Sequence, residues 1–221
     1  MRATDSTGVN IEGARRAVNL AASNSETIMT DLKDGLNEIL TTYQTGWGTQ
    51  SGKDWVEGSC TTDMNALQND VADLLKEIGE KIAGAANGEL TGTDNSQSIA
   101  IPDRPKVIEV QGKLNDVLPE GVAGVLNTFK DDAALKSSEV QNRINADLGA
   151  LQSQVIQQVS SSFSELGSTG QVYADVMSLI NKIKTTVETQ LASLKEFVDT
   201  SADNAEKVSL DLQKRGLSSS N

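Results

Sequence analysis

Apolar residues recur at three- and four-residue steps along almost the whole chain, and this spacing most restricts what the chain can fold into. One stripe runs from Ala14 to Trp47 and the next from Cys60 to Ala85. Residues three and four positions apart lie on one face of an α-helix. Both stripes are narrow, which is typical of helices that pack in coiled-coil fashion and not of helices buried in a wide globular core. The spacing therefore predicts an all-α protein of long helices.

A glycine-rich break around Gly48 separates these two stripes. Ser51 is followed three residues later by Asp54, a spacing typical of the first turn of a capped helix. The helix before the break would cover about residues 9–45 and would be about 55 Å long at the helical rise per residue. Because so short a connection joins neighbouring antiparallel helices, residues 1–86 are predicted to form one helical hairpin.

The second part of the chain repeats this plan. Residues 87–105 lack helical periodicity and are rich in Gly, Asn, Ser and Pro, which predicts a linker. Residues 106–216 carry a stripe that starts at Ile108, with a kink or break expected at Pro119, and then a second glycine break and a last stripe. They are predicted to form the second helical hairpin, and residues 217–221 a flexible tail.

Neither predicted hairpin can bury its own apolar stripes. Two hairpins that bring their stripes together make a four-helix bundle with a single shared core. Only seven aromatic residues occur in the 221-residue chain, so this core must be mainly aliphatic. The predicted fold is therefore two long antiparallel helical hairpins that form an elongated four-helix bundle.

The composition excludes several classes of function. The formal net charge of -12 disfavours binding to nucleic acid or to anionic membranes, because both need clustered Lys and Arg. The chain has no His and a single Cys60, so a Cys-His site, a Ser-His-Asp site and an internal disulfide are all impossible within it. We expect no catalytic residues, no metal site and no cofactor, and we expect Cys60 to be a small buried apolar residue.

Three acidic groups need a separate explanation. They are Asp70 with Asp73, Glu77 with Glu80, and Asp131 with Asp132. Carboxylates three residues apart share one helix face, and on a solvent-facing stripe this usually produces a charged surface. A di-iron bundle would need inward Glu residues together with Glu-x-x-His, which a chain without His cannot provide. We therefore interpret these groups as solvated surface.

No targeting segment is visible in the sequence. The first residues lack the apolar stretch of a secretory signal peptide, and no window has the length and apolarity of a membrane-spanning helix. We expect a protein that is soluble and cytoplasmic when made. If it is exported, it must use a route that needs no such signal peptide.

The first glycine break resembles the turn of the WXG100 (ESAT-6-like) family, whose members are small helical hairpins exported by type VII secretion systems. The family turn has Trp-x-Gly, a small residue four positions after the Trp and an aromatic residue eight positions after it. Trp47, Ser51 and Trp55 occupy the Trp, small and aromatic positions, while the glycine lies one residue early, at Gly48. The resemblance covers about residues 6–86.

The resemblance implies a function in protein association. Family members pair so that two hairpins form an antiparallel four-helix bundle, and two hairpins in tandem would build that dimer within one chain. The Tyr-x-x-x-Asp/Glu export signal of the family is absent after Tyr43 and Tyr173, which implies a divergent signal or one on a partner. The expected partner is the secretion machinery, a cognate helical protein or a second copy.

Two roles are open for the residues of this turn, Trp47, Gly48, Ser51 and Trp55. Their rings can close the end of the bundle, or they can bind a partner, since Trp is favoured at binding hot spots. Two other functions also remain open for the whole chain. It could be a membrane-acting toxin that stores amphipathic helices, or a structural spacer or adaptor of a secretion or phage apparatus.

Overall fold

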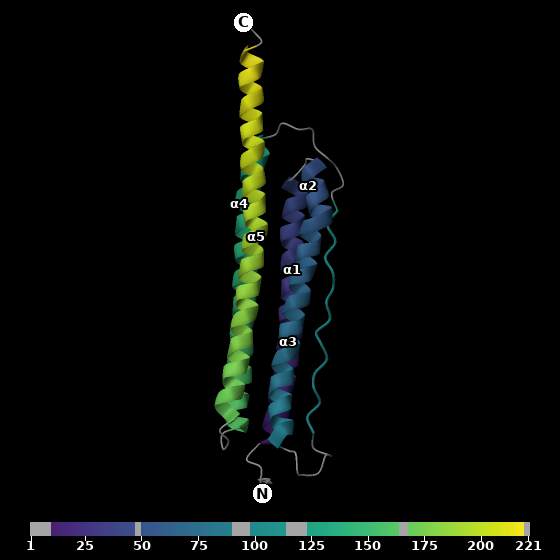
Figure 1. Cartoon of the computed structure of the whole chain (residues 1–221), viewed down its shortest axis with the longest axis vertical. Coiled ribbons are helices and arrows are strands. Elements are labelled where there is room, and N and C mark those ends of the chain that lie inside the picture. Colours follow the sequence, from purple (N-terminus) through teal and green to yellow (C-terminus); the bar gives the residue numbers. More distant parts are fainter. Residues whose placement is uncertain (1–9, 47–49, 90–97, 114–122, 164–167, 219–221) are drawn as a thin grey trace. The chain divides into compact units, whose positions relative to one another are not determined.

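The computed structural model of the protein describes residues 10–46, 50–89, 98–113, 123–163 and 168–218 (Figure 1). Within these residues it contains helices and irregular segments and no strand. Four long helices account for most of the chain, and they are α1 (Ile11–Gly46), α3 (Thr61–Glu89), α4 (Ala123–Ser162) and α5 (Ser168–Ser218). The predicted all-α bundle of four long helices is confirmed.

A short helical run precedes α3 without a break. It consists of α2 (Gln50–Trp55) and a single π-helical turn, η1 (Val56–Cys60). α1 ends at Gly46, one residue beyond the predicted end, which is within the usual uncertainty of a helix boundary. No helix among the described residues combines the length and the apolar character that a membrane-crossing helix needs.

The chain forms two compact units, and each unit takes a part of all four long helices. The first unit comprises Met1–Leu32, Gln68–Ile108 and Arg143–Val187. The second comprises Lys33–Leu67, Glu109–Asn142 and Glu188–Asn221. Both predicted hairpins therefore contribute to both units.

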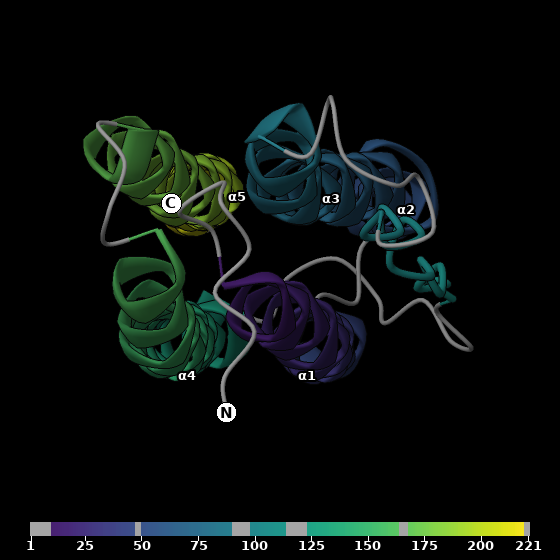
Figure 2. The ribbon, with the colours of Figure 1, turned by 90° about the horizontal axis from the view of Figure 1, so that it is seen from below.

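In the first unit, the beginning of α1 lies with the end of α3, and the end of α4 lies with the beginning of α5. The helices of each hairpin therefore run in opposite directions. The hairpins are also opposed to each other, because the start of α1 meets the end of α4, where the Asn10 N–H donates to the Ser162 carbonyl at 2.9 Å. The end of α3 also meets the start of α5, and α3 lies beside α5 in Figure 2. Lys81 and Asp175 form an ion pair between these two helices at 4.0 Å. Each helix is thus antiparallel to its neighbours.

The core of each unit is made of the predicted apolar stripes. In the first unit the buried side chains include Ile28, Leu32, Val71, Ile78, Ile82, Leu148, Val155, Val159, Val176 and Ile183. In the second they include Leu36, Ile39, Tyr43, Met64, Leu67, Val140, Leu191, Leu194 and Val198. Ser25 interrupts the first stripe and is buried, and its hydroxyl donates to the Ala21 carbonyl at 2.6 Å. Its polar group is therefore satisfied inside its own helix.

The second hairpin begins later than the sequence predicts. The periodicity predicts a helical stripe from Ile108, but residues 98–113 form no regular secondary structure and Ile108 is exposed. The first helical residue of α4 is Ala123, and the break expected at Pro119 lies outside the described residues. The physical reason is that this segment is fixed by contacts with α3, described below. At the other end, α5 extends to Ser218.

In the second unit, α1 and α4 approach closely at Gly35. A methyl group on Gly35 would lie 2.7 Å from both γ-carbons of Val140. Valine is stiff at χ1 within a helix and cannot turn aside. The close contact with Val140 therefore requires glycine at position 35, although glycine costs a helix about 1 kcal/mol relative to alanine.

Replacement of this glycine should separate the two helices. We expect Gly35→Leu to lower the free energy of unfolding by about 1–3 kcal/mol, because the added side chain overlaps Val140. Urea denaturation followed by circular dichroism measures the change. Gly149→Leu is the matched control, since Gly149 lies within α4 and an added methyl group there would meet no other atom within 4 Å. It should be neutral or slightly stabilising, and equal losses in both variants would contradict the close approach.

Candidate functional site

The sequence-predicted site residues are only partly described. Trp47 and Gly48 lie outside the described residues, and so does the side chain of Ser51, whose backbone belongs to α2. Trp55 is the last residue of α2 and is buried, with 9% of its surface exposed. The site can therefore be built around Trp55 alone among the four.

Trp55 lies between two other aromatic rings in the second unit. Its ring centroid is 5.4 Å from that of Tyr43 on α1, with the planes tilted by 48°. On the other side it stacks on Phe197 of α5, at 4.4 Å and 11°. We call Tyr43, Trp55 and Phe197 the aromatic cluster. Because α1 belongs to the first hairpin and α5 to the second, the cluster joins the two hairpins.

The π-helical turn after Trp55 explains how this region is arranged. Such a turn contains one residue more than an α-helical turn, so it shifts the buried face of the helix. As a result Trp55, Val56 and Cys60 are all buried, and Met64 continues the buried stripe in α3. The hydroxyl of Thr61 donates to the Val56 carbonyl at 2.6 Å, which satisfies an acceptor in the widened turn.

Cys60 and Tyr43 are core residues in this region. Burial, and to a smaller extent the nearby Asp63 carboxylate, raises the pKa of the Cys60 thiol to about 12. Burial also raises the pKa of Tyr43 above its ordinary value, with the Cys60 group adding to the effect. The thiol is therefore protonated at neutral pH and is not activated as a nucleophile. The buried position of Cys60 agrees with its predicted role as a small core residue.

A second feature, absent from the sequence predictions, is an extended segment that lies along α3. We call residues 98–113 the strap (Figure 1). In the first unit, the side-chain amide of Asn87 binds the backbone of Ile99 at two points. Asn87 Nδ2 donates to the Ile99 carbonyl at 2.9 Å, and the Ile99 N–H donates to Asn87 Oδ1 at 2.8 Å.

Two further contacts hold the strap within the first unit. The Pro102 ring packs over Gly79, where a methyl group would lie 2.2 Å from the proline Cγ. The Arg104 guanidinium donates to Asn69 Oδ1 at 2.9 Å and to the Asn69 carbonyl at 3.0 Å, and it pairs with Asp73. Gly79 is needed here because any side chain at this position would occupy the place of the proline ring.

The second unit repeats the same kind of contact. Asn65 Nδ2 donates to the Val110 carbonyl at 3.1 Å, and the Val110 N–H donates to Asn65 Oδ1 at 2.8 Å. The Gly112 N–H donates to the Thr61 hydroxyl at 3.1 Å. A methyl group on Gly112 would lie 2.5 Å from the Val56 carbonyl oxygen. The end of the strap therefore rests on the π-helical turn that follows Trp55.

In each unit the strap is held by α3, at Ile99, Pro102 and Arg104 in the first unit and at Val110 and Gly112 in the second. Within the strap Ile99 and Val110 are buried, and the half-buried residues are Pro102, Arg104, Pro105, Val107 and Gly112.

The helix residues that hold the strap had a signal in the sequence that was missed. Thr61, Asn65, Asn69 and Asp73 follow one another at four-residue steps, so they lie on one face of α3. We call these four residues the polar stripe. Small polar residues in such a series, next to an apolar stripe, can bind a neighbouring backbone. The same series is also compatible with plain solvent exposure, so the sequence alone does not decide between the two.

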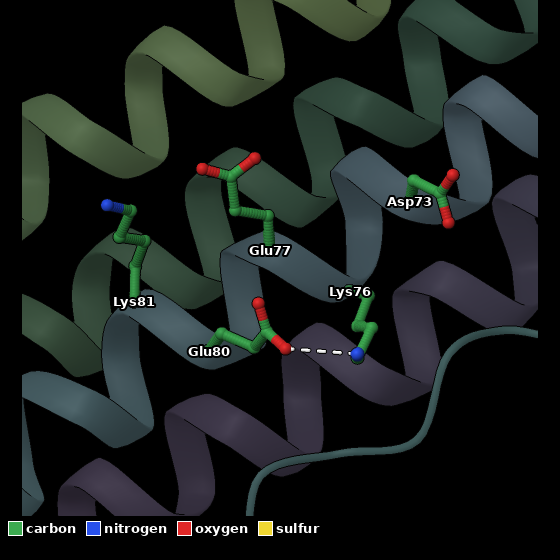
Figure 3. A pocket seen from close by; sticks show the side chains of 5 residues that line it. All are labelled: Asp73, Lys76, Glu77, Glu80 and Lys81. Atoms are coloured by element: carbon green, nitrogen blue, oxygen red, sulfur yellow. Dashed lines mark ion pairs between the residues drawn. The ribbon is translucent and has the colours of Figure 1, made fainter.

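The acidic groups on α3 lie in a charged surface. Asp73, Glu77 and Glu80 line an open hollow of about 480 Å³ with Lys76 and Lys81 (Figure 3). Lys76 pairs with Glu80 at 3.1 Å. In the part of the chain that the structure describes, no three His, Cys, Asp or Glu side chains are grouped so that they could hold a metal ion.

A carboxyl pair lies between α1 and α4 in the first unit. Asp147 faces Asp31, and its Oδ2 atom is buried and has no hydrogen-bond partner among the described residues. Burial and then the adjoining Asp31 carboxyl raise the pKa of Asp147 while Arg143 lowers it, and the net result is a pKa of about 6. The charged form of Asp147 is therefore disfavoured in the folded chain.

Comparisons with known proteins found no match for this chain among protein-family models, curated proteins or solved structures. The resemblance to the WXG100 family therefore depends on the residues of the first glycine break, and membership of that family stays a prediction. Of those residues, the structure describes the side chain of Trp55. The two features of the structure that bear on function are the aromatic cluster around Trp55 and the contacts of the strap with α3.

The carboxyl pair should make stability depend on pH. The folded-state pKa of Asp147 lies above its ordinary value of 3.8, so the folded chain binds the proton more tightly, and this contribution to stability is lost as the pH rises from about 4 to about 6. Asp147→Asn removes the charge at every pH. We expect this variant to be more stable than the wild type by about 1–2 kcal/mol at pH 7.5, with partial solvation of the carboxyl reducing the full effect.

Urea denaturation at pH 4.5 and pH 7.5 measures this difference. The difference in stability between the two proteins should be clearly smaller at the lower pH, where only about a third of it has developed. Asp132→Asn is the matched control, because Asp132 is an exposed carboxylate on the same helix. A stabilisation of Asp147→Asn that is the same at both pH values would contradict the raised pKa.

Proposed function

We propose that the protein is a non-enzymatic helical-bundle protein that acts by association with another protein, as a substrate of a type VII secretion pathway. The observation that supports this most is the aromatic cluster. Phe197 stacks on the buried Trp55, yet 43% of the Phe197 surface is exposed. An aromatic ring that is fixed on one side and open on the other has the form of a binding hot spot.

The Phe197 ring is also restricted before any partner binds. Because stacking on Trp55 already restricts the Phe197 ring, little side-chain entropy would be lost on binding. The ring is thus prepared for a partner without a change of fold.

The antiparallel arrangement of the hairpins supports the link with secretion. Members of the WXG100 family pair two separate hairpins into an antiparallel four-helix bundle, and this chain has two opposed hairpins in one polypeptide. A chain of this kind would need no second helical protein to complete its core. We propose that it folds in the cytoplasm and is exported without a Sec-type signal peptide, through recognition by the secretion machinery.

The direct test uses a secretion ATPase of the FtsK/SpoIIIE type encoded next to the gene for this chain. We expect its purified cytosolic part to bind the chain in isothermal titration calorimetry. Phe197→Ala should weaken binding at least about tenfold, since aromatic hot spots contribute strongly to affinity. Tyr173→Ala is the matched control, because Tyr173 is an aromatic residue of the same helix with 42% of its surface exposed. It should leave the affinity unchanged.

Two results would contradict the proposal. One is equal binding by the wild type and Phe197→Ala, and the other is export that continues at the same level when the ATPase gene is deleted. Leakage of dye from liposomes on addition of the chain at acidic pH would instead support the membrane-acting toxin. Circular dichroism of both variants checks that the helices are retained.

A further inference from the structure

The strap shows that α3 can recognise an extended polypeptide through its backbone. Asn87 donates one hydrogen bond to the carbonyl of Ile99 and accepts one from its N–H. This two-point contact imitates the pairing between neighbouring β-strands, and it needs no particular side chain on the bound segment. Backbone recognition of this type suits a site for peptides.

The remaining contacts in the first unit select for particular side chains. Ile99 is buried with 3% of its surface exposed. Gly79 leaves room for the Pro102 ring, and Asn69 with Asp73 receives the Arg104 guanidinium. Along the strap these residues read Ile-x-x-Pro-x-Arg. The site is therefore defined both by backbone contacts and by three side-chain positions.

In the first unit the anchors of the strap are Ile99, Pro102 and Arg104, and the residues between them are exposed. Ile101 lies between two anchors and is 54% exposed. The ion pair of Arg104 with Asp73 lies at the surface, where such pairs contribute little. Fixing an extended segment also costs conformational entropy at each residue. The tether favours the strap over a free segment with the same anchors, so such a segment binds measurably when its own contacts are stronger or when the anchors of the strap are weakened.

We propose that the surface of α3 formed by Asn69, Asp73, Gly79 and Asn87 is a binding site for an extended, proline-containing segment of a partner protein, with the strap as its built-in occupant. The occupant fixes the chemistry of the ligand: an apolar residue at the Asn87 contact, a proline over Gly79 and an arginine at Asn69 and Asp73. This site belongs to the first unit and does not use the aromatic cluster.

The test weakens the strap and leaves the site intact. In the full chain, Ile99→Ser with Arg104→Ala removes two anchors of the strap without altering α3. The probe is a fluorescent synthetic peptide with the sequence of residues 98–106, and its binding is followed by fluorescence anisotropy. The doubly substituted chain should bind the peptide at least about tenfold more tightly than the wild type, because a tethered strap competes at millimolar effective concentration.

Two further variants of the doubly substituted chain show where the peptide binds. Gly79→Val should abolish binding, because even a methyl group there would lie 2.2 Å from the Pro102 ring atom. Gly84→Val is the matched control on the same helix, with no other atom within 4 Å of an added methyl group, and it should retain binding. A peptide with alanine in place of Arg104 should bind more weakly.

The proposal is overturned if the doubly substituted chain retains its helicity and shows no saturable binding up to several millimolar peptide. Equal loss of binding in Gly79→Val and Gly84→Val would also overturn it. Should the double substitution unfold the chain, hydrogen exchange of the wild type with excess peptide takes its place. The Ile99 amide, protected by Asn87, should then exchange faster in the presence of the peptide, and an unchanged rate would reject the site.

Discussion

The fold of each unit depends on the burial of the apolar stripes that all four long helices contribute, and the strap then connects the two hairpins along α3. Opposed hairpins place the end of α3 in the first unit and the start of α4 in the second, so the connecting chain must pass from one unit to the other. Residues 98–113 of this connection form no regular secondary structure, so their backbone groups need other partners. Asn87 and Asn65 supply them, one in each unit.

The close approach of the hairpins follows from the same arrangement. With α1 and α4 antiparallel, Gly13 meets Ser162 in the first unit and Gly35 meets Val140 in the second. Small residues at these positions let two long helices pack backbone to side chain over an aliphatic core. The aromatic cluster adds a contact between α2 and α5 in the second unit. The antiparallel order of the hairpins therefore determines which helices touch, both in the aliphatic core and at the aromatic cluster.

The sequence predicts the helices and the core well, because burial follows the helical period directly in residues such as Ile28, Leu36 and Leu148. It predicts the strap poorly. Asn65 and Asn87 bind the backbone of the strap, and their sequence does not show which segment will reach them. Residues 98–113 themselves have the composition of a simple linker. Trp55 could be singled out from the sequence, but its stacking partner Phe197 could not, because 142 positions separate them and no motif connects them.

The pairing of two hairpins within one chain is tested most directly by a disulfide between the start of α1 and the end of α4. A methyl group on Gly13 would lie 3.2 Å from the Ser162 β-carbon, a little less than the roughly 3.5–4.5 Å between β-carbons in disulfides, so a small outward shift of the two helices allows the bond. With Cys60→Ala, the substitutions Gly13→Cys and Ser162→Cys should oxidise to a cross-linked single chain of 23.4 kDa on a non-reducing gel. Covalent dimers of twice that mass, or two thiols that remain free under oxidising conditions, would contradict this account.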